Sequence, residues 1–139
     1  MRETEFVKVT VQHWRKEGVK EEDFVKWCQE EQVPRYIGLV KKHGFFRWTM
    51  YFTPSASRAP LEALLAGKPG YKVDDYDVVL NYYAPSLDNV VSLMSDPEFV
   101  TRASEPEQAW VDTTRAHLQI GHEVVYLDYG EFTSTLPTD

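Results

Sequence analysis

The sequence is poor in cysteine and in positive charge, and it has no long apolar run. Cys28 is the one cysteine in 139 residues, which excludes an intrachain disulfide framework and a cysteine-ligated zinc site. A net charge of −7, from 22 acidic against 15 basic residues, would repel phosphate, so we expect no nucleic-acid partner. No apolar run approaches the ~20 residues of a membrane-spanning helix. The first residues, MRETEFVKV, lack the apolar core of a signal peptide, and we expect a cytoplasmic protein with no membrane partner.

The common catalytic and cofactor motifs are also missing. The sequence has no P-loop, no glycine-rich dinucleotide turn and no nucleophile elbow. No histidine pair, or histidine and carboxylate, stands at helical i, i+4 spacing with a third ligand nearby, so no metal is expected.

Aromatic residues, in contrast, are abundant. They make up 14% of the chain, as four Trp, eight Tyr and seven Phe, which suits a wide apolar cavity as well as a dense core. The length and the 42% hydrophobic content predict a single domain over residues 1–139 with a core of its own.

Hydrophobic periodicity predicts the element order β-α-β-β-α-β. The expected elements are strands over residues 5–14, 45–53, 75–83 and 117–131, a helix over 20–44, and helical pieces capped by Ser86 and started by Pro97. Pro34 has no amide proton, so the first helix should kink or restart there. Residues 54–71, rich in proline and glycine, are expected to form a surface excursion that covers a cavity mouth.

This order is the ferredoxin-like topology, an α+β fold with a four-stranded antiparallel sheet and helices on one face. Large apolar residues occur on both faces of the predicted strands, so a single layer of helices would leave one apolar face uncovered. A sheet-to-sheet homodimer would bury that face.

Four stretches, in order, resemble the EthD-like family of dimeric α/β barrels, in particular the forms found in fungal secondary-metabolite pathways. They are RKEGVKEEDFVKW, EEQVPRYIGLVKKHG, SDPEFV and WVDTTRAHLQIGHEVVYL. The resemblance implies a homodimer without cofactor, with a pocket in each subunit between the sheet and its own helices. It also implies a decarboxylase, dehydratase or cyclase of a polyketide-like polycarbonyl intermediate, while related barrels include cofactor-free oxygenases.

The resemblance draws attention to Gln32, because relatives commonly carry histidine in the Glu-Glu-His-x-Pro segment. Helical spacing places Gln32 in the apolar stripe with Tyr36, Leu39 and His43, so its side chain should face inward. A buried amide can hold a substrate carbonyl but cannot exchange protons. The alternative is that Gln32 only satisfies backbone groups freed by Pro34.

Histidines on the predicted strands are the candidates for proton transfer. His117 and His122 stand five residues apart, so they face opposite sides of one strand and only one can face the pocket. His122 has apolar neighbours and is either the catalytic base or a satisfied core residue. His117 lies on a mixed face that equally suits a dimer interface. His13 shares its face with the valines of the first strand.

A second catalytic candidate is Asp77, in the middle of a predicted strand. A carboxylate on a covered sheet is costly unless it is paired, so Asp77 is either an edge residue or a functional group that orients the proton-transfer histidine. Arg35 and Arg47 are its possible partners.

The remaining candidates are polar or aromatic side chains expected to contact substrate. They are Gln32, His43, Trp48, Tyr51, Asn81, Tyr83 and Trp110. His43 has another explanation, because a cation in the last helical turn interacts favourably with the helix dipole. An aromatic stripe can likewise be ordinary core.

Three functions remain open from the sequence. The first is an acid-base enzyme that dehydrates, decarboxylates or cyclises a polycarbonyl or aromatic intermediate. The second uses the same pocket as a template for rearrangement or for cofactor-free oxidation. The third is a ligand-binding barrel without catalysis.

Overall fold

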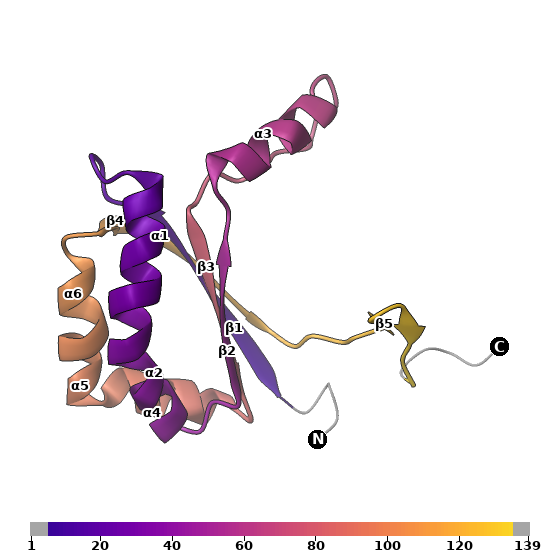
Figure 1. Cartoon of the computed structure of the whole chain (residues 1–139). Helices are drawn as coiled ribbons and strands as arrows, with labels where there is room; N and C mark the ends of the chain where they lie inside the picture. Colours follow the sequence, from indigo (N-terminus) through magenta and orange to yellow (C-terminus); the bar gives the residue numbers. More distant parts are fainter. Residues whose placement is uncertain (1–5, 135–139) are drawn as a thin grey trace.

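A four-stranded antiparallel sheet with helices on one face forms the centre of the molecule (Figure 1). The computed structural model describes residues 6–134. The strands and helices are β1 (Val7–Arg15), α1 (Glu21–Trp27), η2 (Cys28–Gln32), α2 (Val33–Lys42), β2 (Arg47–Phe52), α3 (Ser55–Leu64), β3 (Val78–Ala84), α4 (Leu87–Ser95), α5 (Pro97–Phe99), η3 (Val100–Ser104), α6 (Glu105–Glu107), β4 (Val111–Gly121), β5 (Leu127–Asp128) and β6 (Glu131–Phe132). The predicted ferredoxin-like α+β fold is confirmed. Glu5, the predicted start of the first strand, lies outside the described residues.

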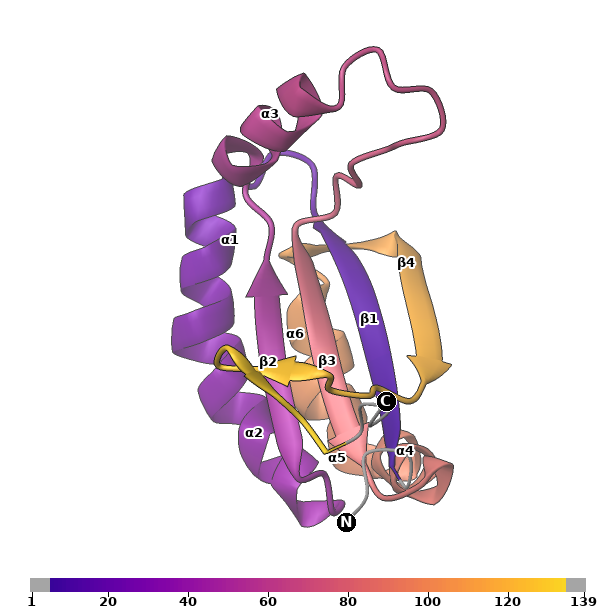
Figure 2. The same cartoon turned by 90° about the vertical axis from the view of Figure 1, so that its right-hand side faces the viewer.

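The strand order is β2-β3-β1-β4, which Figure 2 shows from the face that carries no helices. β1 is paired with β3 on one side, where Val9 is opposite Tyr82, and with β4 on the other, where Val11 is opposite Leu118. Side chains alternate along each strand. Val9, Val11 and the next residue of that series, His13, therefore point toward the helices.

The first helical segment contains a π-helical turn where the sequence predicts a kink. α1, η2 and α2 follow one another without a break, and Pro34 lies in the first turn of α2. Proline cannot donate the regular intrahelical hydrogen bond, and a π-turn accommodates the resulting change of spacing. Gln32, the last residue of η2, is buried with 2% of its surface exposed, as the helical stripe predicts.

The C-terminal part of the chain differs from the prediction. The strand predicted over residues 117–131 is in fact β4, which begins at Val111 and ends at Gly121. Gly121 is opposite Lys8, near the start of β1, so little of β1 remains to pair with a longer strand. Residues 127–132 instead form the hairpin β5–β6, which turns at Gly130 with a φ of 81°. This hairpin stands away from the sheet on the side opposite the helices (Figure 1).

Two local predictions have opposite outcomes. Ser86 caps α4 as predicted, since its Oγ accepts a hydrogen bond of 3.2 Å from the amide of Asp88. The excursion at residues 54–71 does contain a helix, α3, but it projects from one end of the sheet (Figure 1). None of its residues lines the cavity described below, so the prediction that it covers a cavity mouth is wrong.

Candidate active site

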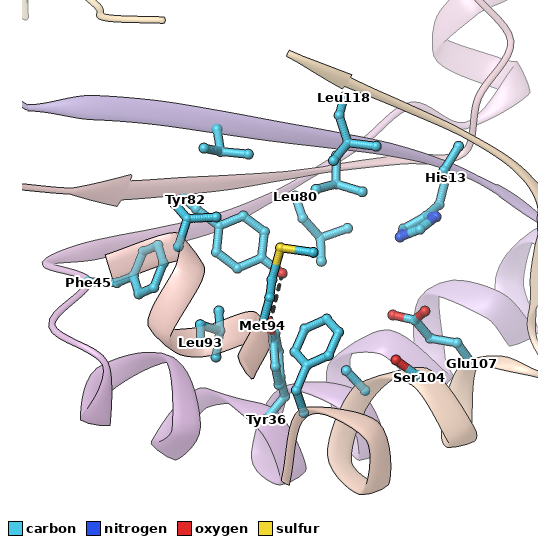
Figure 3. Close-up of a pocket in the computed structure, with 16 residues that line it drawn as sticks. His13, Tyr36, Phe45, Leu80, Tyr82, Leu93, Met94, Ser104, Glu107 and Leu118 are labelled. Carbon is cyan, nitrogen blue, oxygen red and sulfur yellow. Dashed lines mark hydrogen bonds between the residues drawn. The ribbon is translucent and has the colours of Figure 1, made fainter. Parts of the chain in front are cut away.

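A mainly apolar cavity of about 280 Å³ lies between the sheet and the helices (Figure 3). Val9, Leu80 and Leu118 line it from the sheet, and Leu93 and Phe99 line it from the helical layer. The polar side chains that reach it are His13, Tyr36, Tyr82, Ser104 and Glu107. Among the described lining residues there is no lysine or arginine, so the cavity holds no fixed positive charge.

His13 enters the cavity from β1, where it is opposite Val78 of β3 and Ala116 of β4. Its Nδ1 is buried and has no hydrogen-bond partner among residues 6–134. Burial lowers the pKa of His13 to about 4, because removal from water disfavours the charged imidazolium. At neutral pH, His13 is therefore an uncharged imidazole that can accept a proton.

Glu107 reaches the same end of the cavity from the short helix α6. Figure 3 shows its carboxyl and the imidazole of His13 pointing into one region from opposite walls. Burial raises the pKa of Glu107 to about 7, so both its protonated and its ionised forms are populated at neutral pH. A neutral base and a protonatable acid thus share one end of an apolar cavity, an arrangement that is typical of acid-base catalysis.

Gln32 positions the carboxyl group of Glu107 through a hydrogen bond. The Nε2 of Gln32 donates a hydrogen bond of 3.3 Å to Oε1 of Glu107. Because Gln32 is buried and does not itself line the cavity, its amide orients the acid and is not placed to bind substrate. The predicted inward orientation of Gln32 is confirmed, and its partner is a carboxyl group that the sequence did not indicate.

The histidines predicted to transfer the proton lie elsewhere. His122 is exposed and follows the last residue of β4. His117 is also exposed, with its ring 4.9 Å edge-on from that of Trp14 on the face without helices. Neither residue lines the cavity, because β4 presents Ala116 and Leu118 to it.

Asp77 is buried and forms a half-buried ion pair with Arg15 outside the cavity. Its Oδ2 accepts a hydrogen bond of 2.8 Å from the backbone amide of Arg15, and its Oδ1 pairs with the guanidinium of the same residue. The predicted partners Arg35 and Arg47 are thus incorrect, because the pairing of β1 with β3 brings the end of β1 to this carboxylate. Asp77, the residue that precedes β3, accordingly joins the start of β3 to the end of β1.

The predicted substrate-binding residues are divided between several places. Trp48 packs on the helix side, with its ring 5.6 Å from that of Tyr36. Tyr51, Asn81 and Tyr83 lie on the opposite face of the sheet, since they alternate with residues that face the helices. Tyr83 contacts Glu123 there, at 3.2 Å from its hydroxyl.

His43 and Trp110 also lie outside the cavity. His43 forms hydrogen bonds with Ser92 at 2.6 Å and with Asp96 at 2.7 Å, and it connects the end of α2 to α4. Trp110 stacks on Trp27 with an interplanar angle of 10°. Both side chains therefore have structural partners where they lie.

Among residues 6–134, no group of three or more His, Cys, Asp or Glu side chains could hold a metal ion. No helix within the same residues is long and apolar enough to cross a membrane.

The chain is similar over most of its length to three fungal proteins. The chain is 26% identical over 135 residues to the dehydratase iacD of Pestalotiopsis fici, covering 96% of this chain and 97% of that protein. It is 27% identical over 123 residues to the conidial pigment biosynthesis dehydratase EthD of Metarhizium robertsii, covering 88% and 86%. A decarboxylase of Claviceps purpurea is 26% identical over 120 residues, covering 86% and 84%.

Solved structures share the fold at low sequence identity. An EthD-like protein from Ralstonia eutropha has a TM-score of 0.58 and 15% identity, covering 88% of this chain and 95% of that one. A dimeric protein of unknown function with a ferredoxin-like fold, from Bacteroides fragilis, has a TM-score of 0.52 and 14% identity, covering 85% and 96%. The EthD domain model matches residues 16–114, a range that includes β2, β3, the start of β4 and all of the helices around the cavity, and the chain belongs to the EthD domain family.

Proposed function

We propose that this protein is a lyase of secondary metabolism that removes water from a neutral, polyketide-like β-hydroxy ketone. The observation that carries the proposal is the pairing of neutral His13 with protonatable Glu107 at one end of an apolar cavity. The names of two relatives, a dehydratase and a conidial pigment biosynthesis dehydratase, support the same class.

The reaction balances with these two side chains. His13 takes the proton from the carbon next to the ketone, which gives an enolate and an imidazolium. Glu107 in its protonated form donates its proton to the hydroxyl group as the carbon–oxygen bond breaks, and water leaves. The imidazolium then returns its proton to the Glu107 carboxylate, so the products are the unsaturated ketone, water and the original enzyme.

The charge of the cavity favours loss of water over loss of carbon dioxide. A substrate for decarboxylation would bring a carboxylate into a cavity whose described lining offers no lysine or arginine. It would also lie near Glu107, whose ionised form repels it. Burying an unpaired carboxylate is costly, whereas a neutral hydroxy ketone avoids this cost.

The test is incubation with two matched bicyclic probes in D₂O, followed by NMR. One probe is a fused-ring β-hydroxy ketone and the other is the corresponding β-keto acid. We expect loss of water from the first at a rate that exceeds any loss of carbon dioxide from the second. Recovery of both probes unchanged from protein that binds them would contradict the proposal and support a ligand-binding barrel, and faster loss of carbon dioxide would assign a decarboxylase.

Gln32 provides a test of how the acid is positioned. We expect Gln32→Leu to lower kcat about 10-fold with little change in KM, because a hydrogen bond to a charged group contributes about 1.5–3 kcal/mol. Loss of the amide donor should also raise the pKa of Glu107 further, moving the alkaline limb of the pH–rate profile upward. The matched control is Gln29→Leu, at an exposed position of the same π-turn. An unshifted alkaline limb in the Gln32 variant would refute this positioning role.

We also infer that two copies of the chain pair through the sheet face that carries no helices. The hairpin β5–β6 stands off this face with apolar side chains in solvent, Tyr129 at 99% and Phe132 at 80% exposure. Exposed apolar surface of this kind is typical of interaction sites, and the ferredoxin-like protein from Bacteroides fragilis is a dimer. A second copy is therefore the proposed partner.

Light scattering after size exclusion tests the pairing. We expect the wild-type chain to elute with the mass of a dimer, and the double change Tyr129→Ser and Phe132→Ser to shift the mass toward the monomer as the concentration falls. The control is Leu64→Ser, a change at a position 71% exposed on α3, which should leave the mass unchanged. A wild-type monomer at all concentrations would refute the proposed pairing.

A further inference from the structure

Two tyrosines meet inside the cavity, away from the His13 end. Tyr36 comes from α2 and Tyr82 from β3, and the hydroxyl of Tyr82 donates a hydrogen bond of 3.2 Å to that of Tyr36 (Figure 3). A hydroxyl has one proton to donate. When the Tyr82 proton is directed to Tyr36, the Tyr36 proton has no acceptor among residues 6–134 and remains available to a ligand in the cavity.

Trp48 packs against Tyr82. The Trp48 ring lies 6.1 Å from that of Tyr82, and its Nε1 is buried without a partner in hydrogen-bond geometry among the described residues. Burial raises the pKa of Tyr82 well above its ordinary value, and the nearby indole N–H opposes part of that rise. The hydrogen bond therefore runs from Tyr82 to Tyr36, and Trp48 supports this orientation by packing against the Tyr82 ring with its N–H nearby.

Both tyrosines act here as donors and not as bases. Burial raises the pKa of Tyr36 to about 12, so its hydroxyl stays protonated at every pH where the protein would work. A fixed donor in an apolar cavity stabilises a developing oxyanion more than the same donor does in water. The structure thus contains an oxyanion donor that is separate from the proposed acid-base pair.

We propose that Tyr36, oriented by Tyr82 and Trp48, binds the enolate or phenolate oxygen of a compact substrate with one or two rings. The assignment rests on the proposed function, in which removal of a proton by His13 creates an enolate. Size limits the substrate, because an apolar cavity of about 150 Å³ holds benzene and this one measures about 280 Å³. Tyr36 is the residue that touches the ligand, and Tyr82 and Trp48 are positioning residues.

Equilibrium binding of 2-naphthol, compared with naphthalene, tests the donor without requiring turnover. We expect Tyr36→Phe to weaken 2-naphthol about 10-fold, as the loss of one hydrogen bond does, and to leave naphthalene binding unchanged. In wild type, ring-substituted 2-naphthols of lower acidity, whose oxygen is the stronger hydrogen-bond acceptor, should bind more tightly, and this trend should be absent in the variant. Tyr82→Phe and Trp48→Phe should reduce the slope of the trend without abolishing it, which a purely structural role would not do.

The control variant is Tyr51→Phe, a change at a position 62% exposed on the opposite sheet face, which should preserve both affinities. Equal weakening of 2-naphthol and naphthalene by Tyr36→Phe would overturn the proposal, because the tyrosine would then only shape the cavity. Failure of wild type to bind either probe would also overturn it. The proposed function has a separate test. If the protein binds 2-naphthol selectively but never dehydrates the hydroxy ketone, the proposed function is wrong and the assignment of Tyr36 as a donor stands.

Discussion

Replacing His13 by alanine should lower kcat/KM for dehydration about 100-fold or more, because positioned proton transfer contributes roughly 10²–10⁴-fold. His13 is neutral because burial lowers its pKa to about 4, and its Nδ1 has no protein partner within residues 6–134. No described residue therefore forms a hydrogen bond to Nδ1 of His13 that proton transfer to this nitrogen would have to break. Initial rates with the hydroxy ketone probe, measured on folded variant and wild type at several pH values, provide the test.

The same measurement on His117→Ala and His122→Ala distinguishes the structural assignment from the one based on sequence. Both of these histidines are exposed and lie outside the cavity, so each variant should retain wild-type rates. A normal rate for His13→Ala together with a slow His122→Ala would reverse the assignment. Unaltered far-UV circular dichroism and melting temperature would show that the rates refer to folded protein.

The position of His13 could be predicted from the sequence, but its importance could not. Alternation along β1 places His13 on the same face as Val9 and Val11, and all three line the cavity. His122 is the stronger candidate from the sequence because its neighbours on the expected strand are apolar, but that strand ends at Gly121. The residue at which a strand ends depends on the length of the strand that it pairs with. The alternation within one strand gives no information about that length.

Gln32 and Glu107 show a related limit. Gln32 is the last residue of the π-turn η2 and lies two residues before Pro34. Glu107 directly follows Pro106, in the short helix α6 that comes after the π-turn η3. The helical stripe predicts that Gln32 faces inward, and it does. Glu107 belongs to a helix of three residues, too short for any periodicity. A proline within each helical pattern was the signal available for both sites, since π-turns occur frequently at functional sites.

Replacing Glu107 by glutamine should stabilise the protein at alkaline pH and have a much smaller effect at acid pH. The folded pKa is raised to about 7 from the ordinary 4.5, so the folded state holds a proton that the unfolded state loses between these values. The stabilising contribution of the protonated carboxyl is complete below pH 4.5 and is lost as the pH rises through 7. The shift corresponds to at most about 3 kcal/mol, and glutamine, which does not titrate, avoids the loss.

Urea unfolding at pH 4.5 and pH 8 measures this effect as a difference between variant and wild type. His13 titrates in an overlapping range with the opposite sign, because its lowered pKa costs stability as the pH falls from 6.5 to 4. Both proteins contain His13, so the difference isolates Glu107. Glu105→Gln is the matched control, because it makes the same change at an exposed position of the same helix. The Glu107 variant should also be nearly inactive, because it has no proton to donate. A stability difference independent of pH would mean that Glu107 is ionised in the folded protein, which removes the acid from the proposed mechanism.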